Sequence, residues 1–156
     1  MKTLIAFSST MGCTEQCAKR LKADLGSDVD LIRISRRRKY HLDQYDTVII
    51  GGSIHEGLIQ LAVRRFCQAY LSVLLKKKVG IFVCCMDPGT NEQEMIRRAF
   101  PESLIAHSLA TGYFGGELNL KKMNLLTQIM TRKAARIEEE IELNGKRIQD
   151  FVEKIR

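Results

Sequence analysis

The residues best suited to chemistry lie in a short polar loop near the start of the chain. The loop, residues 8–14 (Ser-Ser-Thr-Met-Gly-Cys-Thr), links an apolar run, Lys2–Phe7, to a pattern typical of a helix. Backbone N–H groups at a helix start lack partners within the helix, and the helix dipole favours negative charge there. Gly12 would let the backbone approach a ligand closely. The loop hydroxyls would add donors, and they belong to Ser9, Thr10 and Thr14. This combination predicts a site for a phosphomonoester held by uncharged donors.

The same loop has a simpler interpretation. Ser and Thr are common helix caps, so Thr14 could be the N-cap of a helix over Thr14–Leu25 without any ligand. The loop has no lysine and is therefore not a Walker A P-loop, and it also lacks the G-x-G-x-x-G pattern of dinucleotide-binding folds. Both interpretations place a helix start here, and only the first requires an anion.

A second candidate ligand loop follows a run of apolar residues in the middle of the chain. Thr47–Ile50 is continuously apolar after its first residue, as expected of a strand covered on both faces. The next segment, residues 51–57 (Gly-Gly-Ser-Ile-His-Glu-Gly), has glycines at both ends, and a helix is expected over Leu58–Leu75. Ligands of open α/β sheets bind beyond the carboxyl ends of the strands, so this loop and residues 8–14 should converge.

The rest of the chain supplies the elements that would position these loops. We expect strands at 29–34, 79–85 and 104–109, a helical turn at 41–46, helices at 91–100 and 146–155, and glycine-containing loops at 86–90 and 110–116. Strands that alternate with helices predict a single α/β domain over residues 1–156, a doubly wound parallel sheet of five strands.

The charge and the cysteine content indicate which classes of partner and which cellular compartment to expect. The chain has 25 Lys and Arg against 18 Asp and Glu, a net charge of +7, which predicts attraction to an anionic partner. There is no apolar run long enough to cross a bilayer and no secretory signal pattern, so five cysteines suggest reduced thiols in a cytoplasm. The charge alone would also suit nucleic acid, but no nucleic-acid-binding motif accompanies it. No zinc-binding pattern or catalytic triad is present either.

Two basic segments contribute to this charge. Residues 33–39 contain a run of Arg and Lys that is either a solvated loop or a contact for an acidic surface. Residues 119–138 predict an amphipathic helix, and no acidic residue occurs between 119 and 136. Such a helix could lie at a membrane interface, or it could pack on the body of the protein or in a homodimer.

The two candidate loops together resemble those of the flavodoxin family, and the resemblance covers essentially the whole chain. Residues 9–15 resemble the family's S/T-x-T-G-x-T phosphate loop, with Met11 and Cys13 at two departures. Residues 48–57 resemble the flavin loop of one branch, the bacterial quinone-dependent protoporphyrinogen oxidases. The resemblance implies a three-layer sandwich with strand order 2-1-3-4-5, an extra basic helix before the last helix, and FMN as cofactor.

The resemblance also implies which residues bind FMN. The phosphate would be held by Ser9, Thr10, Met11, Gly12, Cys13 and Thr14. One side of the isoalloxazine would lie against Ser53, Ile54 and His55, and the other against Cys85, Met86, Asp87 and Gly89. The chain has no Trp, and neither flavin loop has the aromatic residue that usually stacks on the ring, so His55 and Met86 would have to replace it in part.

These features predict an FMN-dependent oxidoreductase or electron carrier, in which no side chain has to act as an acid or base. Its partner would be a redox protein or a quinone, and protoporphyrinogen, an anionic tetrapyrrole, is a possible substrate. A location in the cytoplasm, in contact with the inner face of the membrane through residues 119–136, would fit the charge. The alternative is a flavodoxin-like module that binds no flavin and uses its basic face for an acidic partner.

Overall fold

The computed structural model describes residues 1–10, 12–85, 91–115 and 145–156. In chain order the elements are β1 (Thr3–Phe7), α1 (Cys13–Leu25), β2 (Val29–Arg33), β3 (Thr47–His55), β4 (Leu58–Ile59), α2 (Leu61–Ala69), α3 (Leu71–Leu74), β5 (Lys78–Cys85), α4 (Glu92–Ala99), α5 (Glu102–His107) and β6 (Ala110–Gly115). A final helix covers residues 145–155. The expectations for Met11, Met86, Asp87, Gly89 and the basic segment 119–138 lie outside the described residues.

One sheet organises these elements, in the order β2-β1-β3-β5-β6. Neighbours along this path are parallel; for example, Ile5 of β1 is paired with Leu31 of β2 and with Ile49 of β3. The short strand β4 lies off the path and pairs antiparallel with β3. The predicted doubly wound sheet with five parallel strands is therefore confirmed, and β4 is added to it.

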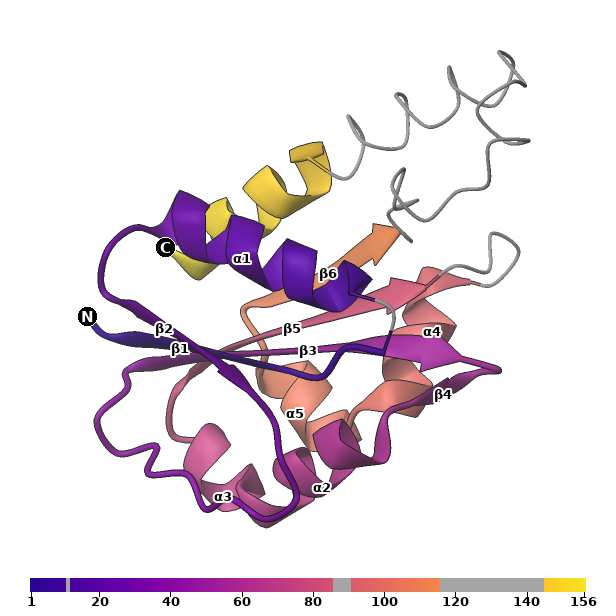
Figure 1. The fold of residues 1–156 in the computed structure, drawn as a ribbon, viewed down its shortest axis with the longest axis horizontal. Helices are drawn as coiled ribbons and strands as arrows, with labels where there is room; N and C mark the ends of the chain where they lie inside the picture. The colour runs from indigo at the N-terminus through magenta and orange to yellow at the C-terminus, as the bar shows by residue number, and fades with distance from the viewer. Residues whose placement is uncertain (11, 86–90, 116–144) are drawn as a thin grey trace.

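Helices cover both faces of the sheet, as Figure 1 shows. One face packs against α2, α3, α4 and α5, with Val63, Phe66, Leu74, Ile96 and Leu104 among the buried residues. The other face packs against α1 and the helix at 145–155, with Ala18, Leu21, Ile148, Phe151 and Val152 among the buried residues. The central strands β1, β3 and β5 read as continuous apolar runs because both of their faces are covered.

Contacts between aromatic rings pack the final helix, residues 145–155, against the sheet. The ring centroids of Phe114 and Phe151 are 5.6 Å apart, and those of Phe82 and Phe114 are 5.1 Å apart. A Cβ on Gly112 would lie 2.8 Å from the Phe114 ring and 3.0 Å from the Phe151 ring. This glycine leaves space for the rings rather than making a turn.

The last strand lies at different residues from those predicted, and the glycine beside these rings is part of the reason. A strand was predicted at 104–109, followed by a glycine-rich loop at 110–116; the structure instead has α5 at Glu102–His107 and β6 at Ala110–Gly115. Pro101 is the N-cap of α5, and Glu102 occupies its first turn, where an acidic residue suits the helix dipole. In β6 the buried residues alternate at Ala110, Gly112 and Phe114, so the period-two pattern was hidden by glycine.

The segment after the middle strand was also predicted incorrectly. Strand β3 does not end at Ile50 but continues to His55, and a two-residue turn leads back into β4. Glu56 and Gly57 both have positive φ, 53° and 78°, as in a type I′ hairpin. A Cβ on Gly51 would lie 2.0 Å from Phe82 Cζ, so this glycine lets the ring pack against the strand. The helix predicted over Leu58–Leu75 is divided into β4, α2 and α3.

Two smaller differences concern the ends of elements. Residues 41–46 make a turn, with a hydrogen bond from Tyr45 N to Leu42 O (3.0 Å), and not the expected helical turn. The first helix begins at Cys13 rather than Thr14, and its N-cap is Gly12 in a left-handed conformation with φ of 91°. Glycine adopts this conformation without the steric cost that a Cβ brings.

Candidate functional site

The predicted ligand loops start from neighbouring strands at one edge of the sheet. β1 and β3 are adjacent and parallel, so their carboxyl ends lie together, and β5 ends beside β3. Ser8, directly after β1, donates its backbone N–H to the carbonyl oxygen of Gly51 in β3 (3.1 Å). Ser8 and the carboxyl half of β3 therefore lie side by side, at the edge where open α/β sheets bind ligands.

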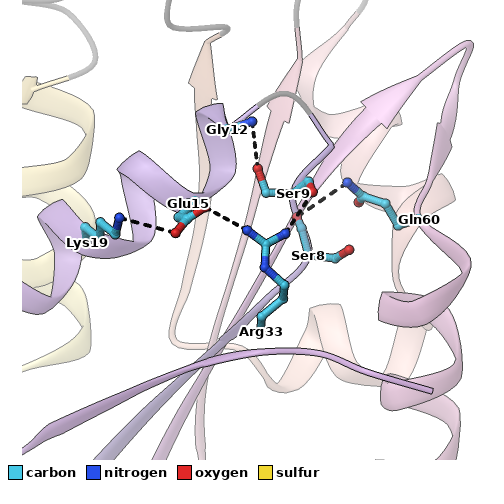
Figure 2. Close-up of polar contacts among 7 residues, drawn as sticks. All are labelled: Ser8, Ser9, Gly12, Glu15, Lys19, Arg33 and Gln60. Carbon is cyan, nitrogen blue, oxygen red and sulfur yellow. Dashed lines mark hydrogen bonds and ion pairs between the residues drawn. The ribbon is translucent and has the colours of Figure 1, made fainter. Parts of the chain in front are cut away.

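Ser9 and Gly12 are joined by a hydrogen bond just before the start of α1. The backbone N–H of Gly12 donates to Ser9 Oγ (3.0 Å), which holds the loop in a turn (Figure 2). The helix has no side-chain hydrogen bond at its N-cap. The N–H groups of its first turn are thus directed toward the loop without a side-chain cap, as in helix starts that bind anions.

Thr14 is the most informative residue of the loop. It is completely buried, and among the described residues its hydroxyl is the buried side-chain polar atom that has no hydrogen-bond partner. Thr14 lies inside α1, so the alternative in which it is the N-cap is wrong. Leaving a buried hydroxyl unpaired costs about 1–3 kcal/mol, and a bound anion would supply the missing acceptor. This orphaned group fits a phosphate in the loop.

Gln60 links the two loops, as Figure 2 shows in part. Its side-chain oxygen accepts a hydrogen bond from Ser53 N (2.9 Å), and its side-chain nitrogen donates to Ser53 Oγ. The same nitrogen also contacts the carbonyl oxygen of Ser8 (3.4 Å) and Oγ1 of Thr10 (3.3 Å). Gln60 was not among the predicted site residues, because the sequence pattern placed it within a long helix; in the structure it is the N-cap residue of α2.

Arg33 brings a positive charge to the outer side of the same loop. Its guanidinium donates to the carbonyl oxygen of Ser9 (3.0 Å) and to Glu15 Oε2 (2.7 Å), and Glu15 also contacts Lys19 Nζ at 3.2 Å (Figure 2). Arg33 lies over the ring of Phe7, 5.3 Å from its centroid. Glu15 offsets one of the two positive charges of Arg33 and Lys19, so the net charge of these three side chains remains positive beside the predicted phosphate. The sequence singled out Arg33 only as part of a basic run.

The predicted flavin-contacting residues of β3 differ in exposure. Ser53 is buried and held by Gln60, Ile54 is buried in the core, and His55 is exposed at the start of the β3–β4 turn. Leu58, which is paired with His55 across the hairpin, has 63% of its surface exposed. The hairpin thus presents an imidazole and an apolar side chain at the edge of the site. Cys85 ends β5, where its backbone is paired with Ile54 and Gly115.

The basic run at 33–39 lines a cavity on the side of the sheet that α2 covers. The cavity has a volume of about 140 Å³, and its lining includes Arg36, Arg38, Arg65, Tyr40 and Tyr70. Arg38 lies over the Tyr40 ring at 5.7 Å from the centroid. One arginine of the run thus packs on an aromatic ring, and three arginines line the same cavity.

Comparisons with known proteins agree with this architecture. A profile of the flavodoxin domain family matches residues 4–142. Protoporphyrinogen IX dehydrogenase [quinone] from Escherichia coli strain K12 is 34% identical over 77 residues, which cover 47% of this chain and 42% of that protein. The chain thus spans less than half of the length of the curated relatives it matches.

Solved structures show the same fold. The Fusobacterium nucleatum flavodoxin bound to flavin mononucleotide has a TM-score of 0.56 at 14% identity, and the match covers 99% of this chain and 97% of that one. Two-electron reduced Megasphaera elsdenii flavodoxin has a TM-score of 0.55 at 20% identity and covers 76% and 89%. The predicted family is confirmed by the family match together with this architecture: the chain belongs to the flavodoxin domain family.

Proposed function

We propose that this chain binds FMN at the carboxyl edge of its sheet and transfers electrons. The observation that carries the proposal is Thr14, whose buried hydroxyl has no partner among the described residues and lies in the loop that resembles the family's phosphate loop. Bound FMN would supply the redox chemistry, since a flavin accepts and passes on electrons without a protein nucleophile. The residues of the protein hold, orient and electrostatically tune it.

Each part of the site has its own task in this proposal. The phosphate would accept hydrogen bonds from the loop Ser9–Thr14 and the first turn of α1, with Arg33 adding positive charge from outside. Ser53, Ile54 and His55 would border one side of the ring system, and Cys85, Met86, Asp87 and Gly89 the other. Gln60 would keep the two loops at a set distance through Ser53 and Thr10.

The proposed reaction is the oxidation of an anionic tetrapyrrole, protoporphyrinogen, with a quinone as acceptor. Support comes from the curated relatives, which are named protoporphyrinogen IX dehydrogenase [quinone], and from the net charge of +7. The exposed Leu58 beside His55 would give the apolar ring system of this substrate a contact at the site. Among the described residues no helix has the length and apolar character needed to cross a membrane. We propose a cytoplasmic location, with contact to the membrane or to a second subunit through 119–136.

The test begins with the absorption spectrum of the purified full-length chain, before and after FMN is added and excess is removed on a desalting column. Retained flavin absorbance, at one FMN per chain, is the expected result. The loaded protein is then mixed with protoporphyrinogen and a quinone without oxygen, and porphyrin fluorescence is followed. Flavin retention without porphyrin formation would leave an electron carrier and reject the dehydrogenase. Failure to retain FMN would reject the whole proposal.

The alternative function is a flavin-free binding module with an acidic partner. The arginine-lined cavity at Arg36, Arg38 and Arg65 favours it, because a cluster of guanidinium groups suits carboxylate or phosphate groups. The spectrum separates the two functions, since this module would stay colourless after exposure to FMN.

A further inference from the structure

Three cysteines meet beneath the loop at residues 8–14. Cys13 and Cys17 lie one turn apart on α1, and Cys84 lies on β5. Their sulfur atoms are all within 4.8 Å of one another, and the Sγ atoms of Cys17 and Cys84 are 3.7 Å apart. Nothing in the order of residues predicted this group, since 67 positions separate Cys17 from Cys84.

The environment of the three thiols is closed on one side and accessible on the other. Cys17 is 5% exposed and Cys84 is 1% exposed, so both lie in the core between α1 and the sheet. Cys13, the first residue of α1, is only half-buried. An ion could therefore reach the cluster from the loop side and be enclosed by apolar neighbours on the other.

The spacing suits a metal ion that prefers sulfur. Metal–sulfur bonds of about 2.3 Å place the sulfurs of a three- or four-coordinate site about 4 Å apart, so the cluster requires only small side-chain movements to bind an ion. Thiolates select soft ions such as Cu(I) and Zn(II). Within the described residues, the three thiols make up this group of potential ligands, with no imidazole or carboxylate among them. A set of three sulfurs suits Cu(I) directly, whereas Zn(II) would take its fourth ligand from the exposed side at Cys13.

A metal ion that binds to the three thiols has to replace their protons. Hydrogen bonds with the Cys13 and Cys17 thiols, together with burial, raise the pKa of the Cys84 thiol. A bound cation would displace these protons and offset the charge of the thiolates, as in other sulfur sites. The start of the α1 dipole favours negative charge at Cys13.

We propose that Cys13, Cys17 and Cys84 form a binding site for one sulfur-preferring metal ion, of the class of Cu(I) and Zn(II), directly beneath the candidate phosphate loop. The site is separate from electron transfer by FMN and does not require it.

The experiment uses the full-length chain, fully reduced and stripped of metal under anaerobic conditions. Cu(I) is supplied from a complex with a coloured chelator, and Zn(II) is titrated separately against a second chelator. Metal bound per chain is measured after desalting, and ultraviolet charge-transfer absorbance reports sulfur coordination. One ion per chain with this absorbance is expected. The preferred metal is the one whose free ion has the lower dissociation constant for the protein.

The variants decide whether the two buried thiols of the cluster are ligands. Cys17→Ala and Cys84→Ala should each weaken binding by roughly tenfold or more, because each removes a direct ligand. Cys67→Ala is the matched control, since Cys67 is a buried thiol outside the cluster and should leave binding unchanged. Circular dichroism checks folding; Cys17→Ala, at a helical position where alanine is favourable, keeps the test valid if Cys84→Ala unfolds.

Three results would overturn the proposal. They are the absence of charge-transfer absorbance with both ions, unchanged affinity in a folded Cys17→Ala variant, and an equal loss of affinity in Cys67→Ala. These readings are made without FMN, so failure of the FMN proposal does not affect them.

Discussion

Gln60 and Ser53 are joined by two hydrogen bonds, one in each direction. The backbone N–H of Ser53 donates to Gln60 Oε1 at 2.9 Å, and Gln60 Nε2 donates to Ser53 Oγ. Because the same nitrogen also reaches Thr10, one side chain sets the separation between the two loops that would hold the phosphate and the ring of FMN.

Replacement of Gln60 by Ala should weaken FMN binding without unfolding the protein. The variant removes hydrogen bonds worth about 1 kcal/mol each, so we expect an FMN dissociation constant about tenfold higher. Quenching of FMN fluorescence on titration measures it. Gln44→Ala is the control, because the contacts of Gln44 with described residues are long ones (3.5 Å) to Lys2 and His41 at the surface. An unchanged constant for Gln60→Ala would show that the loops keep their separation without this side chain.

Thr14→Val should change stability and FMN binding in opposite directions. Valine has nearly the shape of threonine and removes a buried hydroxyl that has no partner among the described residues, so the ligand-free protein should gain about 1 kcal/mol of unfolding free energy. The same change removes a donor to phosphate and should weaken FMN binding about tenfold. Urea unfolding of the ligand-free protein and FMN titration give the two values. Unchanged FMN affinity in a folded Thr14→Val variant would contradict the role of Thr14 as a phosphate ligand.

Gly51→Ala should destabilise the protein although it changes only one methyl group. Its Cβ would lie 2.0 Å from Phe82 Cζ, so the ring or the strand must shift, at a cost of about 1–3 kcal/mol. Thermal unfolding followed by circular dichroism measures the loss. Gly145→Ala is the control, since a Cβ there meets no atom within 4 Å and alanine favours helix. The double variant Gly51→Ala with Phe82→Leu should lose less unfolding free energy than the two single variants lose together, because the smaller side chain relieves the contact.

Alkaline pH should destabilise the protein through Tyr45. Burial and the hydrogen bond from its hydroxyl to Asp30 Oδ2 (2.7 Å) raise the pKa of Tyr45 from about 10 to about 12. The folded state therefore retains the proton longer than the unfolded state does, and this contribution to stability is complete below pH 10 and is lost as pH rises toward 12. Urea midpoints measured from pH 9 to 12 should fall more steeply for the wild type than for Tyr45→Phe, which has no phenol to ionise. Parallel curves would assign the alkaline loss to other groups.

Much of the fold was predictable because its signals are local. The apolar run before Ser8, the small residues of the loop and the helix pattern after it are adjacent in the chain, so strand, loop and helix start could be located together. Where a local signal had two meanings, prediction failed. Gly51 and Gly112 look like loop residues, yet both lie in strands where a ring of Phe82, Phe114 or Phe151 occupies the space of a side chain.

The site was predictable only in part for the same reason. Ser53 and His55 were predicted as site residues from their neighbours in the chain, but Gln60 gave no signal, since a glutamine near the expected start of a helix is ordinary. Arg33 stood out only as one of several basic residues, and its contacts with Ser9 and Glu15 depend on β2 lying beside β1.

The sequence by itself determined the strand–loop–helix unit at residues 2–25, the alternation of strands and helices, and hence the parallel sheet. These follow from hydrophobic periodicity and from helix-capping chemistry, which act over a few neighbouring residues. Only the tertiary structure decided that Gln60 reaches Thr10 across 50 positions and that Cys84 meets Cys17 across 67. Such contacts depend on the order of strands in the sheet and on which face each helix covers, and packing of the whole chain sets both.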